Sequence, residues 1–351
     1  SKAGYATGYI GKWHLDATAD RPGFVPKSRR FDHQYWAAYN VSHYYRKSGY
    51  YLDTDELRRP SPPDRWEPEY QVDQAVEFMG RNRAKPFYLM VSFGPPHPPG
   101  AGDDHPWQEH LPDGYWDQIN PDALKFRGNV PAELTGRGGA AIEHMRGYYA
   151  SILALENSIA RMMKGVPPNT LVVITADHGE MGGSHGAFKK GSPHEEAVRV
   201  PLGFSWQGKI SENLKVSTLA SGVDVMPTVL GLAGVKAPGG LHGEDLSDWV
   251  LGDEGPDRDV ILIQGRMERQ DAWRMVRSRT HIWSESLDGR RQQLYDLRED
   301  PFQMDNLAGK EKSSELRADL ESKMASIRKR FKDKRTPSKS DPKGQPDNDE
   351  A

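Results

Sequence analysis

The sequence contains no cysteine among its 351 residues, which excludes disulfides, thiolate metal sites and cysteine nucleophiles. It also has no apolar run that approaches the roughly 20 residues a membrane helix needs. The sequence also has no large excess of positive or negative charge, because its formal net charge is -3. Dedicated nucleic-acid binders usually have a clear basic excess. We therefore expect a protein whose partners are neither membranes nor nucleic acids.

The sequence does contain alternating helical and strand patterns. Residues 71–83 carry apolar side chains three and four positions apart, which is typical of an amphipathic helix. Residues 86–93 then run apolar nearly throughout, as in a strand buried on both faces. The same succession returns as a helical pattern over 143–163 and an apolar run over 171–175. This alternation predicts an α/β protein with a parallel sheet.

The character of the sequence changes after about residue 257. Four short strand patterns and one helical pattern follow, over residues 260–264, 272–276, 281–284, 294–297 and 311–331. They predict a small antiparallel sheet with a helix. We expect an α/β domain over 1–258, the small sheet and helix over 259–335, and a polar, disordered tail over 336–351. Residues 16–70 show weak periodicity and predict short elements at most.

Three loops with histidines follow predicted strands. His14 lies after the apolar residues 6–10, His97 after 86–93, and His178 after 171–175. Ligand sites of α/β sheets gather at the carboxyl ends of strands. The loops therefore predict one site.

The candidate site has six members: Lys12, His14, His97, Asp177, His178 and Lys190. The Asp–His pair offers an oxygen and a nitrogen ligand to a divalent cation. The lysines are compact cations that suit a tetrahedral oxyanion such as sulfate or phosphate. The other two histidines can donate hydrogen bonds, or a proton to a leaving alkoxide. This chemistry fits hydrolysis of a sulfate or phosphate ester.

Six segments resemble motifs of the type I sulfatases, arylsulfatase-like members of the alkaline phosphatase superfamily, in family order. They are residues 4–15 with Gly-Lys-Trp-His, 96–99, 175–179, 190–201, 224–230 and 294–301. The resemblance implies an α/β/α sandwich of alkaline-phosphatase type with a small C-terminal antiparallel-sheet subdomain. It implies a sulfuric ester hydrolase that acts on a sulfated small molecule or glycan. It also implies one divalent cation, most often Ca²⁺, with Mg²⁺ as the alternative. Bacterial relatives are often periplasmic or secreted.

The resemblance also implies roles for individual residues. By matching position, Asp177 and His178 bind the cation, and Lys12 and Lys190 hold the sulfate oxygens. His97 acts near the leaving group, and His14 acts near the nucleophile. His185 stands where many members have a His-Gly pair, and its role stays open.

Two parts of the family pattern are absent before the Gly-Lys-Trp-His segment. One is a pair of acidic metal ligands, and the other is the Cys/Ser-x-Pro-x-Arg motif that is converted to formylglycine. Residues 61–65 match Ser-x-Pro-x-Arg literally but lie after that segment, and we interpret them as a proline-rich surface loop. We therefore expect an N-terminally truncated chain that is unstable and inactive by itself.

Two alternatives stay open at this point. Phosphonate monoester and phosphodiester hydrolases resemble this pattern too, because an anion between Lys12 and Lys190 can have sulfur or phosphorus at its centre. A non-catalytic anion-binding pseudoenzyme would bind sulfate or Ca²⁺ without turnover. The residues identify neither the substrate nor the oligomeric state.

Overall fold

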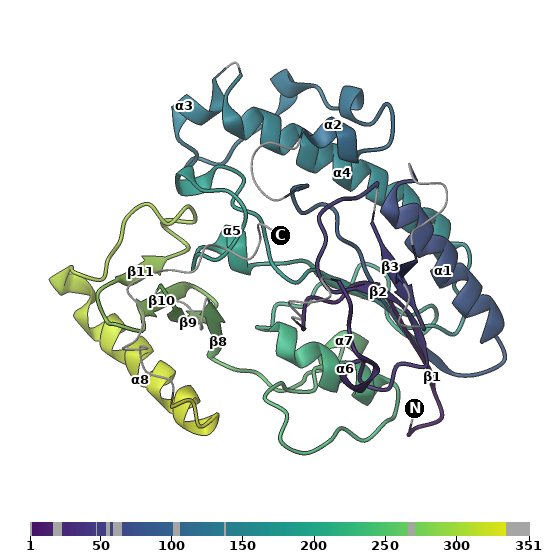
Figure 1. Cartoon of the computed structure of the whole chain (residues 1–351). Coiled ribbons are helices and arrows are strands. Elements are labelled where there is room, and N and C mark those ends of the chain that lie inside the picture. The colour runs from purple at the N-terminus through teal and green to yellow at the C-terminus, as the bar shows by residue number, and fades with distance from the viewer. Residues whose placement is uncertain are drawn as a thin grey trace. The chain divides into compact units, whose positions relative to one another are not determined.

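A computed structural model describes residues 2–16, 23–46, 48–53, 57–58, 65–100, 106–136, 138–265 and 271–334 (Figure 1). Their contacts divide the chain into two units, which are described separately. The first contains the described residues of 1–126 and 132–170, and the second contains 127–131 and those from 171 onward. Residues 61–64 of the Ser-x-Pro-x-Arg match and the predicted tail over 336–351 lie outside the described residues. The predicted boundary near residue 258 stays a prediction.

A five-stranded sheet forms the centre of the first unit. Its strands are β1 (Ala6–Lys12), β2 (Tyr35–Tyr39), β3 (Tyr50–Leu52), β4 (Leu57–Arg58) and β5 (Phe87–Ser92), in the order β4-β3-β2-β1-β5. β1 runs parallel to β2 and β5, with Ile10 opposite Ala37 and Val91. β3 and β4 continue the sheet antiparallel. The predicted α/β class is confirmed, and β1 extends two residues further than its pattern predicted.

Two helices lie side by side in the first unit (Figure 1). They are α1 (Glu67–Arg81) and α4 (Ala140–Met163). Both predicted helices are confirmed, and α1 begins earlier because proline is tolerated in a first helical turn. Gly147 brings α4 close to the Trp107 ring, since a Cβ at this position would lie 2.1 Å from that ring. None of the described helices is long and apolar enough to cross a membrane.

The remaining elements of the first unit are short. They are η1 (Lys27–Arg29), α2 (Trp107–His110), η2 (Trp116–Gln118), η3 (Pro121–Ala123) and α3 (Ala132–Thr135). Four of these lie between β5 and α4, in a region rich in glycine, proline and aspartate that favours turns.

The structure corrects the predicted burial of the two strands that were expected from apolar runs. Tyr88 and Met90 of β5 are 43% and 44% exposed. In the second unit, β6 (Val172–Thr175) pairs antiparallel with β7 (Leu202–Ser205), and Ile174 is 52% exposed. Composition shows that a face is apolar, but it cannot show that another layer covers that face.

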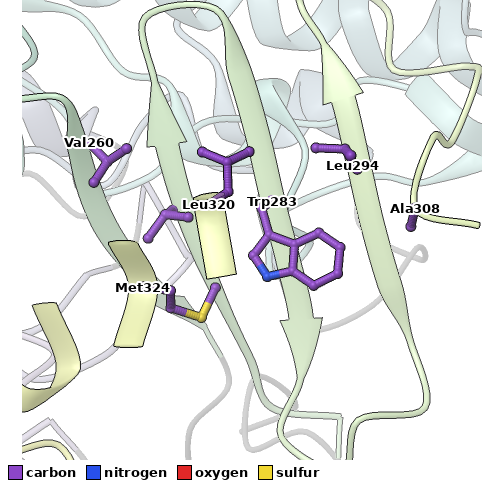
Figure 2. Close-up of a cluster of buried hydrophobic side chains, with 7 residues drawn as sticks. Val260, Trp283, Leu294, Ala308, Leu320 and Met324 are labelled. Carbon is purple, nitrogen blue, oxygen red and sulfur yellow. The ribbon is translucent and has the colours of Figure 1, made fainter. Parts of the chain in front are cut away.

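The predicted C-terminal sheet is confirmed in the second unit. It contains β8 (Val260–Gly265), β9 (Trp273–Ser278), β10 (His281–Ser286) and β11 (Gln292–Asp296), all antiparallel and adjacent in chain order. η6 (Glu311–Ser313) leads into α8 (Ser314–Arg330), which packs on the sheet. Leu320 and Met324 of this helix meet Trp283 and Leu294 in the core (Figure 2). Burial of such side chains away from water stabilises the subdomain.

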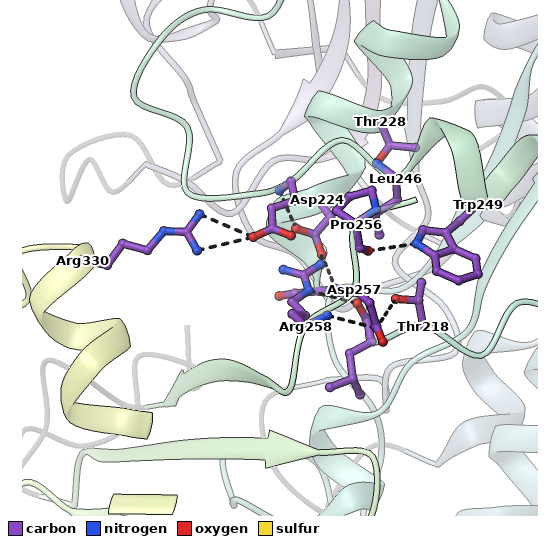
Figure 3. A network of polar contacts seen from close by, with 12 residues as sticks. Thr218, Asp224, Thr228, Leu246, Trp249, Pro256, Asp257, Arg258 and Arg330 are labelled. Carbon is purple, nitrogen blue, oxygen red and sulfur yellow. Dashed lines mark hydrogen bonds and ion pairs between the residues drawn. The ribbon is translucent and has the colours of Figure 1, made fainter. Parts of the chain in front are cut away.

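The other elements of the second unit are η4 (Ser184–Gly186), α5 (Glu195–Val198), η5 (Gly222–Asp224), α6 (Val225–Leu232) and α7 (Ser247–Leu251). A polar network at the start of α6 centres on buried Asp224 (Figure 3). Its carboxylate accepts hydrogen bonds from the backbone N–H groups of Ser221 and Glu244, at 2.6 and 2.9 Å, and pairs with Arg258. A buried carboxylate needs such partners. Asp224 therefore ties α6 to the chain that leads into β8.

Candidate functional site

Lys12 is the last residue of β1, and its side chain is buried. Beyond it, the N–H groups of Trp13 and His14 donate to the carbonyls of Tyr39 and Asn40, both at 2.8 Å. These bonds keep the chain in line with β2 after the strand has ended. His14 has a φ of 53°, and it is exposed. The left-handed turn therefore brings the lysine and the histidine into different surroundings.

Gly11 permits the close contact between β1 and β5. Its φ is 102°, and a Cβ here would lie 2.0 Å from the Ser92 carbonyl oxygen. Only glycine adopts this conformation and tolerates this approach. The Gly-Lys-Trp-His segment thus needs its glycine for packing next to the lysine.

His97 follows β5 in a proline-rich loop and is buried. The Tyr45 hydroxyl donates to the His97 carbonyl at 2.9 Å. The His97 Nδ1 lies 2.8 Å from the carbonyl oxygen of Pro98, so the proton is on Nδ1, because a carbonyl only accepts. The His43 ring stacks on the His97 ring at 4.2 Å and 7°. The sequence pattern had indicated no role for His43.

A fully buried carboxylate in the first unit escaped the sequence analysis. Glu67 accepts hydrogen bonds from the hydroxyls of Tyr39 and Ser48 and, at 2.9 Å, from Gln71 Nε2. Gln71 also donates to the Tyr50 hydroxyl at 2.8 Å. Burial raises the pKa of Glu67 to about 7, although its hydrogen bonds oppose this shift. No pattern within one segment marks Glu67, because its partners come from several segments of the chain.

The parallel pairing of β1 and β5 brings two of the predicted residues to one edge of the sheet. Gly11 is paired with Ser92, so Lys12 and the loop to His97 leave neighbouring strands at their carboxyl ends. The first unit therefore holds Lys12, His14 and His97, half of the predicted site.

The second unit places Asp177 and His178 just after β6. His178 Nδ1 lies 2.8 Å from the Gly179 carbonyl oxygen and so carries the proton. Its Nε2 lies 3.7 Å from Asp177 Oδ1. Gly179 is needed because a Cβ there would lie 2.0 Å from the Glu196 carbonyl oxygen. The strand end and this glycine fix where the pair projects.

Two donor atoms 3.7 Å apart can share one cation, because Ca²⁺ holds its ligands at about 2.4 Å. His178 would bind a metal through Nε2 only in the form in which this nitrogen carries no proton. Among the described residues, no group of three His, Asp or Glu side chains forms a fuller cage. The pair therefore supplies only part of a coordination sphere of about 6–8 oxygens, the range usual for Ca²⁺.

Lys190 lies in a tight loop of the second unit. Lys189 and Gly191 have φ values of 63° and 100°. The Glu180 carboxylate accepts from the Lys189 N–H at 2.6 Å and from the Gly182 N–H at 3.1 Å. The loop is thereby joined to the segment that follows β6. The second unit holds the remaining three predicted residues, whose roles stay predictions.

His185, whose role the sequence left open, belongs to a polar cluster near this loop. Its ring stacks on that of His194 at 4.1 Å, and its Nε2 lies 3.1 Å from Asn129 Nδ2. The same amide group donates to Glu196 at 2.8 Å. His194 Nδ1 lies 2.6 Å from the Ser192 hydroxyl. Burial, and then the neighbouring His185, lower the pKa of His194 to about 4.

We expect His194 to stay neutral at pH 7 and to titrate near pH 4, which ¹H–¹³C NMR of the ring can measure. His185→Gln should move this midpoint upward, because it removes the second cause of the shift. A midpoint at or above the ordinary value of 6.5 in the unsubstituted chain would contradict the prediction. Since the folded state resists this proton, His194 should also contribute to loss of stability as the pH falls from 6.5 to 4.

Comparison with known proteins gives the same family as the motifs. The family model described as Sulfatase matches residues 1–235, which contain all six candidate residues. A second model, described as N-sulphoglucosamine sulphohydrolase, C-terminal, matches residues 183–330. The chain belongs to the sulfatase family.

Two relatives show how much of such proteins the chain covers. An ulvan-active sulfatase of Formosa agariphila is 31% identical over 94% of this chain, which spans 65% of that protein. An N-acetylglucosamine-6-O-sulfatase of Bacteroides thetaiotaomicron is 24% identical over 95% of this chain, and the match covers 72% of that protein. The similarity that shows the family thus extends over most of the chain. The relatives named for a sulfatase activity are longer than this chain.

Solved structures confirm the fold. A putative sulfatase of Bacteroides fragilis matches with a TM-score of 0.84 and 27% identity over 95% of this chain and 76% of its own. A structure in complex with D-glucosamine-2-N,6-O-disulfate has a TM-score of 0.76 and 20% identity, over 97% and 82% of the two chains. A phosphonate monoester hydrolase of Agrobacterium radiobacter has a TM-score of 0.65 and 20% identity, over 76% and 61%. The last two show the fold alone.

Proposed function

We propose that this sulfatase-family chain provides the anion-holding part of a sulfuric ester hydrolase. The observation that carries the proposal is the buried Lys12 at the end of β1, with the His97 loop leaving the adjacent parallel strand. Attraction between an ammonium group and an anion is stronger where water is excluded. As the family pattern implies, Lys12 would hold sulfate oxygens, and Lys190 has the same predicted role.

The histidines fit proton transfer to the leaving group. His97 Nδ1 lies 2.8 Å from the Pro98 carbonyl oxygen, and we assign the other ring nitrogen, Nε2, to the leaving group of the substrate. As a nucleophile forms a bond to sulfur and the S–O bond to the alcohol breaks, a protonated Nε2 would give its proton to the departing ester oxygen, so that an alcohol leaves. The flat stack on His43 keeps the His97 ring in one orientation. His14, by its position in the family pattern, would act near the nucleophile.

Asp177 and His178 would bind a divalent cation, most readily Ca²⁺, with Mg²⁺ as the alternative. The 3.7 Å between Oδ1 and Nε2 supports a shared ion. When bound, the cation would neutralise charge on the sulfate group. The pair follows the end of β6, and ligands of α/β proteins commonly lie beyond strand ends.

A sulfated glycan is the substrate class that we propose. Support comes from the names of the relatives, one active on ulvan and one an N-acetylglucosamine-6-O-sulfatase, and from the neighbour bound to a sulfated glucosamine. The second candidate function is hydrolysis of a phosphonate monoester or phosphodiester. The phosphonate monoester hydrolase with the same fold favours it.

The test is hydrolysis by the polypeptide that contains this chain. We expect it to hydrolyse 4-nitrophenyl sulfate at a higher kcat/KM than 4-nitrophenyl phosphate or a phenylphosphonate ester. Addition of a chelator should lower this rate, and Ca²⁺ should restore it. A higher kcat/KM for the phosphonate ester would favour the second candidate. Binding of sulfate without hydrolysis of any of the three esters would instead indicate a pseudoenzyme.

A further inference from the structure

The loop of Lys190 is attached at both ends. Before the lysine, the Glu180 carboxylate accepts the Lys189 N–H at 2.6 Å. After it, the indole Nε1 of Trp273 donates to the Gly191 carbonyl at 2.9 Å. Trp273 comes from β9, 82 positions further along the chain. The small C-terminal sheet therefore contacts the backbone directly beside the anion-binding lysine.

The indole of Trp273 is itself held in place. The residue is 7% exposed and packs with Met275 and Ile282 in a hydrophobic cluster. A Cβ at Gly265, the paired residue on β8, would lie 2.2 Å from the Trp273 ring. The ring thus lies against a position where a side chain would not fit, and its N–H has one fixed direction.

The chain that follows the lysine is fastened to the same sheet region. Arg277 of β9 pairs with both carboxylate oxygens of Glu195, at 3.1 and 3.2 Å. The Gln303 side-chain oxygen accepts the Glu195 N–H at 2.8 Å. Bidentate Arg–carboxylate pairs fix the relative orientation of the two side chains in addition to the electrostatic attraction between them. These bonds anchor the segment that follows the loop to the sheet region. The bonds next to Lys190 therefore act on a loop whose far end is held in place.

We propose that Glu180 and Trp273 are positioning residues that hold the Lys190 loop in its left-handed conformation. Both act through the backbone, one on each side of the lysine. The role of the ordered loop in anion binding rests on the proposed function. The ordering of the loop by Glu180 and Trp273 does not depend on that function.

Trp273→Phe is the first test, because it removes the indole N–H and keeps an aromatic ring. Trp283→Phe is a matched control in the next strand. Trp283 is also buried, and its Nε1 has no hydrogen-bond partner within the described residues. The two substitutions remove the same atoms, but only the first breaks a hydrogen bond to the loop.

Limited trypsin digestion of the folded polypeptide that contains this chain measures loop order, since trypsin cuts after Lys189 and Lys190. Loss of one hydrogen bond should raise the open population, and hence the cleavage rate, about fivefold. Peptides that end at these two lysines report the rate by mass spectrometry. Trp283→Phe should leave the rate unchanged. Glu180→Gln weakens the bonds on the Lys189 side of the loop and should also raise the cleavage rate. This variant tests the proposal if Trp273→Phe does not fold.

Equal cleavage in wild type, Trp273→Phe and Glu180→Gln would overturn the proposal, as would an equal rise in Trp283→Phe. Calorimetric titration with sodium sulfate adds the functional readout. We expect affinity to fall about fivefold in Trp273→Phe and not in Trp283→Phe. If the wild-type chain binds no sulfate, the proposed function fails, and the cleavage rates still decide whether Glu180 and Trp273 order the loop.

Discussion

Replacing Glu67 with glutamine is expected to remove one contribution that lowers the free energy of unfolding as the pH rises from about 4.5 to about 7. The carboxyl is fully buried at the first turn of α1, and burial raises its pKa from 4.5 to about 7. At about 1.36 kcal/mol per pKa unit, this shift corresponds to about 3 kcal/mol. The effect is large because the group is removed from water.

The sign follows from where the proton binds more tightly. Below about pH 4.5, the carboxyl is protonated in both the folded and the unfolded chain. As the pH rises toward 7, the unfolded chain releases this proton first, so unfolding becomes easier. Above about 7 both states are ionised, and the loss is complete. The stability that Glu67 contributes is therefore present in acid and is lost as the pH rises.

Urea denaturation from about pH 4.5 to about pH 8 measures this effect as the difference between wild type and Glu67→Gln. The difference should shift by about 3 kcal/mol in favour of the variant as the pH rises. Glu69→Gln, on the same turn of α1, removes a carboxylate that solvent reaches and serves as the matched control. A difference that stays constant over this pH range would show that Glu67 does not titrate there.

Replacing Lys190 with glutamine is expected to weaken sulfate binding about 10- to 100-fold, because hydrogen bonds to charged groups contribute about 1.5–3 kcal/mol. The loop bonds of Glu180 and Trp273 involve the backbone of Lys189 and Gly191, so the loop should keep its conformation without the ammonium group. The lost affinity would therefore report the charge of one side chain.

Calorimetric titration with sulfate gives the affinity, and kcat/KM for 4-nitrophenyl sulfate gives the effect on turnover in the polypeptide that contains the chain. Lys189→Gln is a demanding control, because it removes the same charge one residue earlier. If both variants lose affinity equally, the effect is general electrostatics, and the assignment of Lys190 is wrong. A selective loss in Lys190→Gln supports direct contact with the anion.

The elements that the sequence predicted well have a local cause. α1 and α4 were predicted because an apolar stripe at helical spacing needs only its own segment to be recognised. The C-terminal sheet was predicted because its strands are short, adjacent and separated by turns. For β5 and β6, the exposure of Tyr88, Met90 and Ile174 contradicts the predicted burial. Whether a face is covered depends on segments elsewhere in the chain.

The candidate site divides in the same way. Lys12, His97 and Lys190 were predicted because each lies in a short motif that can be recognised within one stretch of the sequence. The residues that support them belong to other segments, and a motif search along the chain does not connect the two.

Two such supporting residues, His43 and Trp273, were not predicted, and neither was the buried carboxyl group of Glu67. The bond of Glu67 with Tyr39 joins residues 28 positions apart, and that of Trp273 with Gly191 joins residues 82 positions apart. The ring of His43 likewise meets a histidine of a distant loop. Because no single segment contains both members of such a pair, no local pattern reveals them.

By itself, the sequence determined the family, the helices α1 and α4 and the C-terminal sheet, and it predicted residues whose chemistry suits an anion and a cation. These are properties of single segments, where spacing and residue type carry the information. Only the tertiary structure decided which side chains from distant segments come into contact. The Glu67 network, the His43–His97 stack and the Trp273 bond join distant segments. Such pairings depend on how the chain folds back on itself, which no local pattern encodes.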